Sequence, residues 1–80
     1  MTKLKYIEEN VKNFDEAIQT VVESGQIYLE ECDAHLVKSQ IPDVILLLVY
    51  WDNYIDAFNV TNPIHMQKLR KLLDQVYRCF

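Results

Sequence analysis

The chain has 80 residues, half of them apolar and a quarter charged, and its net charge is −4. This length fits a single domain, residues 1–80, with a modest core. The acidic balance disfavours direct binding to DNA or RNA, because nucleic-acid binders are usually basic. One glycine and two prolines argue against β architecture and against disorder.

The first third of the chain predicts a long amphipathic helix. Apolar residues recur at three- and four-residue spacings: Leu4, Ile7, Val11, Phe14, Ile18 and Val21. Acidic residues recur beside this stripe: Glu8, Glu9, Asp15, Glu16, Glu23, Glu30 and Glu31. We expect these acids to form a ridge along the shoulder of the apolar face.

Ser24-Gly25 leaves two interpretations open. The first helix covers 3–23 and ends with Gly25 as a left-handed cap, and a second helix covers 26–38. Alternatively the two are one continuous helix, because the apolar phase continues through Leu29, Cys32 and Leu36. We favour the break, since an unbroken helix would exceed anything in the chain that could cover it.

Pro42 marks a clear boundary and predicts a third helix over 42–59. This segment is apolar on nearly every side, which is typical of a helix buried by several neighbours. We therefore expect it to be the central and most buried element. Trp51 or Tyr54 should be largely buried in it, together with Leu47, Leu48 and Ile55.

Asn62-Pro63 predicts the start of a last helix over 63–79, with the asparagine as N-cap and the proline in the first turn. Its apolar face comprises Met66, Leu69, Leu72, Leu73, Val76 and Phe80, and its basic face comprises Lys68, Lys71 and Arg78. The pattern predicts an all-α fold, a small antiparallel bundle of three to four helices over 3–23, 26–38, 42–59 and 63–79.

No signal peptide or membrane span is evident, so we expect a cytoplasmic protein without membrane contact. Cys32 and Cys79 should then be reduced, although their helices would end at the same end of the bundle and a disulfide is conceivable. A metal site with His35 is disfavoured, because CxxC and HxxxH spacings are missing. We expect no cofactor and no metal.

Catalytic residues are not apparent. Asp52 and Asp56 would lie one helical turn apart, but they lack the Glu-x-x-His companions of a carboxylate-bridged metal bundle. The only serines, Ser24 and Ser39, would lie at helix ends. We therefore expect a protein that is not an enzyme.

The sequence instead predicts a protein-binding module that docks on a larger, basic partner and inhibits or modulates it. Phage- or plasmid-encoded inhibitors of host nucleic-acid enzymes, such as anti-restriction or anti-CRISPR proteins, are analogous in size and charge. The predicted partner-binding residues are the acids Glu8, Glu9, Asp15, Glu16, Glu23, Glu30 and Glu31. A solvated face that only keeps the protein soluble is the alternative reading of these acids.

Two other functions remain open. The stripe Leu4, Ile7, Val11 and Phe14 could assemble a homodimeric structural or regulatory subunit, and the apolar excess favours a homo-oligomer. The basic last helix could make the protein a weak nucleic-acid-binding regulator.

Overall fold

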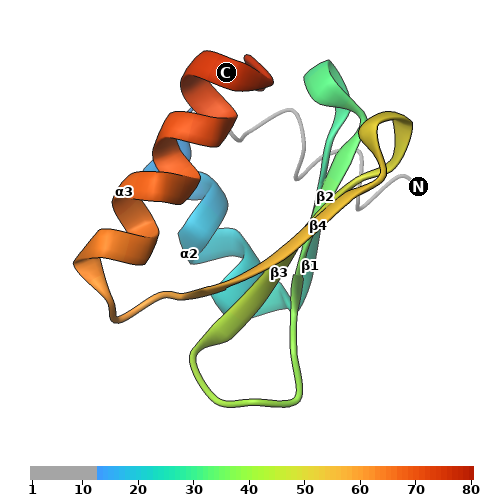
Figure 1. Cartoon of the computed structure of the whole chain (residues 1–80). Helices are drawn as coiled ribbons and strands as arrows, with labels where there is room; N and C mark the ends of the chain where they lie inside the picture. The colour runs from blue at the N-terminus through green and yellow to red at the C-terminus, as the bar shows by residue number, and fades with distance from the viewer. Residues whose placement is uncertain (1–12) are drawn as a thin grey trace.

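A computed structural model of the chain describes residues 13–80 and shows a two-layer α/β fold (Figure 1). Its helices are α2 (Phe14–Ser24) and α3 (Pro63–Lys71), and α3 continues into a π-helical turn, η3 (Leu72–Val76). Its strands are β1 (Gln26–Leu29), β2 (Ala34–Lys38), β3 (Val44–Val49) and β4 (Tyr54–Asn59). Short 3₁₀ turns, η1 (Glu30–Cys32) and η2 (Tyr50–Asp52), connect β1 to β2 and β3 to β4.

The predicted all-α bundle is therefore wrong. The expected helices over 26–38 and 42–59 are two β-hairpins, and the helix over 63–79 keeps α-helical geometry only to Lys71. Apolar residues in both hairpin segments also recur at a spacing of two, as in Ile27 and Leu29, which suits a strand as well as a helix. β-branched and aromatic residues are frequent in 44–58, and they favour strands.

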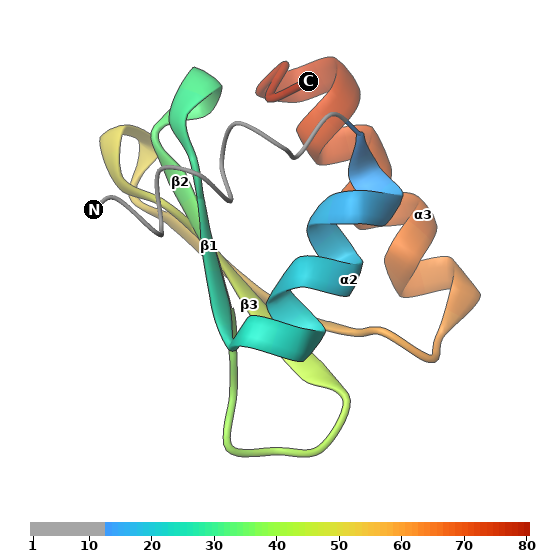
Figure 2. The ribbon, with the colours of Figure 1, turned by 180° about the vertical axis from the view of Figure 1, so that it is seen from behind.

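The four strands form an antiparallel meander in the order β1-β2-β3-β4. Both helices lie on the same face of this sheet, as the two opposite views agree (Figures 1 and 2). Alternate strand residues point toward the helices and are buried there: Ile27, Leu29, Ala34, Leu36, Ile45, Leu47, Val49 and Phe58. Phe14, Ala17, Val21, Leu69 and Leu73 meet them from α2 and α3.

Helix α2 begins and ends through local signals. The Asn13 side chain accepts a hydrogen bond from the Glu16 backbone N–H at 2.9 Å, so Asn13 is the N-cap. Gly25 ends the helix in the left-handed conformation, with φ of 92°. The predicted break at Gly25 is confirmed, although a strand and not a second helix follows it.

Helix α3 begins as predicted, because the Asn62 side chain accepts hydrogen bonds from the backbone N–H groups of Ile64 and His65. The π-helical turn then inserts one extra residue per turn and rotates the residues that follow. Leu69 and Leu73 are buried as expected, but Val76 is 58% exposed and Cys79 points inward instead. None of the helices within 13–80 is long and apolar enough to cross a bilayer.

Candidate functional site: the hairpin-loop surface

The two hairpin loops have the same length and the same backbone conformation. Each has four residues, 30–33 or 50–53, between a closing strand pair, Leu29 with Ala34 or Val49 with Tyr54. Three of the residues form a 3₁₀ turn, and the fourth is left-handed: Asp33 has φ of 49° and Asn53 has φ of 50°. Asp and Asn tolerate this conformation better than most non-glycine residues. The chain therefore makes tight hairpins without glycine.

Three side-chain links join the loops to each other and to the C-terminal segment. The Trp51 indole N–H donates to the Cys32 carbonyl oxygen at 2.9 Å, which connects η2 to η1. Cys32 forms a disulfide with Cys79, with 5.0 Å between their Cα atoms. The Tyr77 hydroxyl donates to an Asp52 carboxylate oxygen at 2.7 Å. This end of the molecule is thus held in one arrangement.

The disulfide overturns the expectation that both cysteines are reduced. Free thiols are typical of the cytosol, so the pairing gives no support to a cytoplasmic location. The predicted geometry, with both cysteines at one end of the molecule, is correct, but for a different reason. Cys32 lies in a hairpin loop and Cys79 follows the π-helical turn.

Large aromatic side chains and acids share this end. We define the hairpin-loop surface as Glu30, Glu31, Asp33, Tyr50, Trp51 and Asp52. Tyr50 is 52% exposed and Trp51, the only tryptophan in the chain, is 62% exposed. Neither loop contains Lys or Arg, and the nearest of these residues along the sequence is Lys38, at the far end of β2. Exposed aromatic rings among carboxylates suit a partner with cationic and apolar groups.

Neighbouring rings support both exposed aromatics. Trp51 packs edge-on against Tyr77, with 5.6 Å between ring centroids. Tyr50 packs edge-on against His35 at 5.5 Å, and its hydroxyl lies 2.8 Å from His35 Nδ1 in a hydrogen bond. His35 in turn lies 4.8 Å from the Tyr28 ring. Side chains held this way lose little conformational freedom when a partner binds.

Tyr77 carries the largest pKa change in this region. Partial burial and the hydrogen bond to the Asp52 carboxylate both favour the neutral phenol, and together they raise its pKa to about 12. Tyr77 therefore remains a hydrogen-bond donor across the physiological pH range. Its partner Asp52 belongs to the hairpin-loop surface, so this bond positions one of the acids there.

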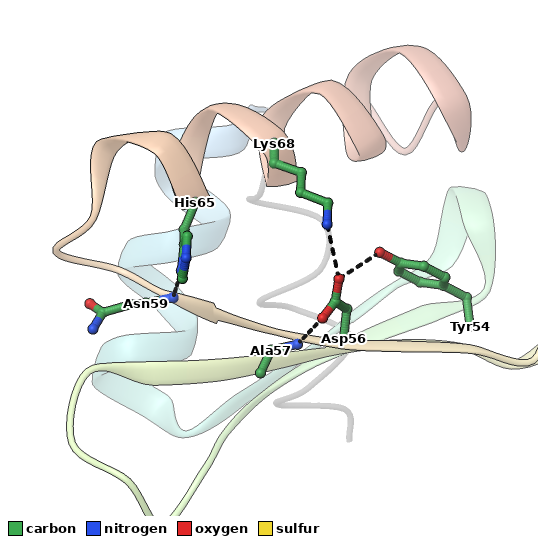
Figure 3. Close-up of polar contacts among 6 residues, drawn as sticks. All are labelled: Tyr54, Asp56, Ala57, Asn59, His65 and Lys68. Atoms are coloured by element: carbon green, nitrogen blue, oxygen red, sulfur yellow. Dashed lines mark hydrogen bonds and ion pairs between the residues drawn. The ribbon is translucent and has the colours of Figure 1, made fainter.

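A second polar cluster lies on β4 and protects the edge of the sheet (Figure 3). The Asp56 carboxylate accepts hydrogen bonds from the Ala57 N–H at 2.8 Å and the Tyr54 hydroxyl at 3.0 Å, and Lys68 Nζ lies 3.3 Å from it. The Asn59 N–H donates to His65 Nδ1 at 3.0 Å. Side chains thus cap two backbone N–H groups that face away from β3. This arrangement hinders pairing with another strand.

The same contacts shift two pKa values in opposite directions. The hydrogen bond from the Ala57 N–H, aided by Tyr54 and Lys68, lowers the pKa of Asp56. Burial, followed by the nearby Asp56 carboxylate, raises the pKa of Tyr54. The pair is therefore a fixed structural contact between a carboxylate and a neutral phenol at neutral pH.

The predicted acidic ridge does not form one line within 13–80. Glu8 and Glu9 lie outside the described residues. Asp15 and Glu16 lie in the first turn of α2, where Asp15 pairs with Arg70 at 3.2 Å, and Glu23 lies near the other end of that helix. Glu30 and Glu31 lie in the η1 loop. Only the last two share a surface with exposed aromatic rings, because Gly25 turns the chain out of the helix.

The predicted self-association stripe can be judged at one residue. Leu4, Ile7 and Val11 lie outside the described residues. Phe14 is 6% exposed and belongs to the core of its own chain, with Arg70 stacked over its ring at 5.1 Å. Phe14 is therefore not an exposed contact residue.

Sequence reasoning placed Tyr50 and Trp51 in a buried central helix and did not predict that they are exposed together in a hairpin loop. The prediction that Leu47 is buried is correct, and Leu48 and Tyr54 are partly buried. Trp51 and Ile55, in contrast, are 62% and 64% exposed. A usable signal was present: Tyr50-Trp51-Asp52-Asn53 follows a six-residue apolar run and ends in a residue that tolerates a left-handed turn. The four-residue loop after β1 likewise ends in a residue of this kind, Asp33.

Among residues 13–80, no group of three or more His, Cys, Asp or Glu is arranged to hold a metal ion. Comparisons with protein-family models, with curated proteins and with solved structures found no significant match. The hairpin-loop surface therefore has to be interpreted from its own chemistry.

Proposed function

We propose that this chain is a protein-binding module that docks on a basic partner through the hairpin-loop surface. The observation that carries the proposal is the exposed Tyr50–Trp51 pair, held by hydrogen bonds and a disulfide among four loop acids. Aromatic anchors of this kind contribute most of the energy in many interfaces.

The charges around the anchors define the chemistry of the partner. Glu30, Glu31, Asp33 and Asp52 attract cationic side chains, and the two rings offer faces on which Arg or Lys can stack. A basic, partly apolar protein segment fits this surface. A nucleic acid does not, because its phosphates would be repelled.

A matched pair of charge reversals tests this function. The probe is an arginine-rich peptide, and Trp51 fluorescence reports its binding because the chain has no other tryptophan. Glu31→Lys should weaken binding about five- to tenfold, which corresponds to about 1–1.4 kcal/mol. Glu23→Lys makes the same change in net charge on an exposed residue of α2 and should change affinity less than about twofold.

Two further measurements complete the test. Trp51→Ala, followed by calorimetry, should reduce affinity at least about tenfold, as expected for an anchor. Association with the unmodified chain should slow as salt increases, because exposed charges are screened over about 8 Å at physiological ionic strength. Equal effects of Glu31→Lys and Glu23→Lys would show that net charge alone attracts the peptide, and would contradict a defined site.

A further inference from the structure

The sheet has a second face that neither helix covers. Both helices lie on one side in the two opposite views (Figures 1 and 2), and no other α-helix occurs within the described range. Strand residues alternate between faces, so the residues between the core positions lie on this open face. We define it by two rows of paired residues: Tyr28, His35, Leu48 and Ile55, then Gln26, Val37, Leu46 and Ala57.

The composition of the open face is typical of a buried surface. An antiparallel sheet with one solvated face usually alternates apolar and polar residues. Strand β3 instead reads Val-Ile-Leu-Leu-Leu-Val, a continuous apolar run that normally indicates burial on both faces. Its Leu46 and Leu48 are partly exposed, and Ile55 beside them on β4 is 64% exposed. The side of β3 that faces away from the helices is therefore apolar but is not covered by α2 or α3.

The absence of charged residues on the open face indicates which kind of surface can pack against it. None of the eight residues of the open face is Asp, Glu, Lys or Arg, whereas the whole chain carries a net charge of −4. Two copies of an acidic protein repel each other wherever their acids meet. On this face they can approach without placing like charges opposite one another. An uncharged face, mainly apolar on β3 and β4, is also compatible with two-fold symmetry, in which the same residues serve both copies.

Side-chain contacts along the edge of β4 indicate that two copies would meet through the open face and not through that edge. Asp56 and His65 cap backbone N–H groups that a neighbouring strand would need, so extending the sheet from β4 is hindered. Two sheets can instead pack face to face, about 10 Å apart and about 30° from parallel.

From these observations we infer that the open face is the contact between two copies of this chain, which form a two-fold dimer. The open face adjoins the hairpin-loop surface, because Tyr28 donates to Asp33 at 2.6 Å and His35 is hydrogen-bonded to Tyr50. The inference nevertheless rests on Leu46, Leu48 and Ile55, none of which belongs to the hairpin-loop surface. It replaces the predicted stripe on the first helix, whose Phe14 is buried in its own core.

The size of the face sets the expected affinity. Four strands at about 4.8 Å spacing, with two rows of side chains that each take two residues of about 3.4 Å along the strand, cover about 19 by 14 Å. Even if protruding side chains enlarge the contact, its area is smaller than the roughly 800 Å² per partner of a standard interface. We therefore expect a weak dimer that dissociates in the micromolar range.

Sedimentation equilibrium of the full chain, over micromolar to submillimolar concentrations, tests the dimer. The unmodified chain should show a monomer–dimer equilibrium, and Leu46→Glu should raise the dissociation constant more than about tenfold by placing a charge in the contact. Ile64→Glu is the matched control, because Ile64 is 73% exposed on α3, away from this face. It should leave the equilibrium unchanged.

A second variant and a second measurement keep the test decisive. Ile55→Glu should also dissociate the dimer, and its effect on folding should be small because the side chain is already exposed. Isotope-filtered nuclear Overhauser effects from mixed labelled and unlabelled chains should connect Leu46 and Leu48 methyls across the two copies. A monomer at every concentration would overturn the inference. So would a dimer that both substitutions leave intact, or methyl contacts that arise only within one chain.

Discussion

At the scale of single residues, a few polar side chains do what glycine or a covering element does in many other proteins: they occupy left-handed turns and block the edge of the sheet. Asp33 and Asn53 adopt left-handed conformations that allow four-residue hairpin loops. Asp56 uses its carboxylate to cap a backbone N–H on the exposed edge of β4, and His65 caps another. Asn13 and Asn62 do the same at the starts of the two helices. Side-chain oxygens and one ring nitrogen thus accept hydrogen bonds from backbone N–H groups that have no partner in a helix or sheet at these positions.

Asp56→Asn tests the charge of the β4 cluster. The variant keeps the size of the side chain but loses the ion pair with Lys68, and we expect its free energy of unfolding to fall by about 1 kcal/mol at pH 7. Because folding lowers the pKa of Asp56, this contribution is fully present above the usual value near 3.8 and is lost as pH falls through the lower native value.

Denaturant unfolding of both proteins from neutral to acidic pH measures this effect. The two unfolding free energies should converge once the pH falls below the lowered native pKa of Asp56, because the carboxylate is then protonated in both the folded and the unfolded state. Asp74→Asn, on the exposed π-helical turn, is the control for removing an acid elsewhere. A constant difference across the pH range would show that the charge of Asp56 is irrelevant.

At the scale of elements, the two hairpins and their loops decide which surface the molecule presents. Each loop ends its 3₁₀ turn with a left-handed residue, so the next strand returns directly beside the previous one. In η2 this return leaves Tyr50 and Trp51 outside the core, even though they follow a strand that is almost wholly apolar. The π-helical turn of α3 similarly moves Val76 out of the core and brings Cys79 in. Local backbone geometry, more than hydrophobicity, determines these exposures.

Substitutions of Asn53 test the loop design. Asn53→Val should lower the free energy of unfolding by about 1–2 kcal/mol, because a β-branched residue is strained at a φ of 50°. Asn53→Gly should be neutral or slightly stabilising, since glycine adopts this conformation without strain. Thermal unfolding followed by circular dichroism gives the order of the variants' stabilities. A valine variant as stable as the glycine variant would contradict the prediction.

At the scale of the whole molecule, one disulfide connects the two layers. Cys32 and Cys79 are 47 residues apart in the sequence, and their bond joins the β1–β2 hairpin to the segment after α3. Tyr77 and Trp51 pack beside this junction, so the hairpin-loop surface depends on it. The small core of the described chain gives such a cross-link a large share in stability.

The double variant Cys32→Ala/Cys79→Ala should lower the free energy of unfolding by about 4 kcal/mol, the chain-entropy value for a loop of this length. Denaturant unfolding of the oxidised protein, the reduced protein and the double variant measures it. Trp51 emission should shift on reduction, because its indole N–H is bonded to the Cys32 carbonyl. Equal stability of the oxidised and reduced proteins would show that the bond contributes little.

The sequence by itself determined the features that depend on neighbouring residues. Asn62 and Pro63 predicted the start of α3, Gly25 predicted the end of the first helix, and Pro42 predicted the boundary that lies between β2 and β3. Caps, prolines and left-handed turns act within a few residues, so their signals can be read from one stretch of chain.

Only the tertiary structure decided the rest. Residues 26–38 and 44–59 carry apolar side chains at spacings that suit both helix and strand, and pairing with distant strands selects the strand. The contact of Cys32 with Cys79, and the gathering of Tyr50 and Trp51 among loop acids, likewise join segments far apart in sequence. These features depend on non-local packing, which a single local pattern does not specify.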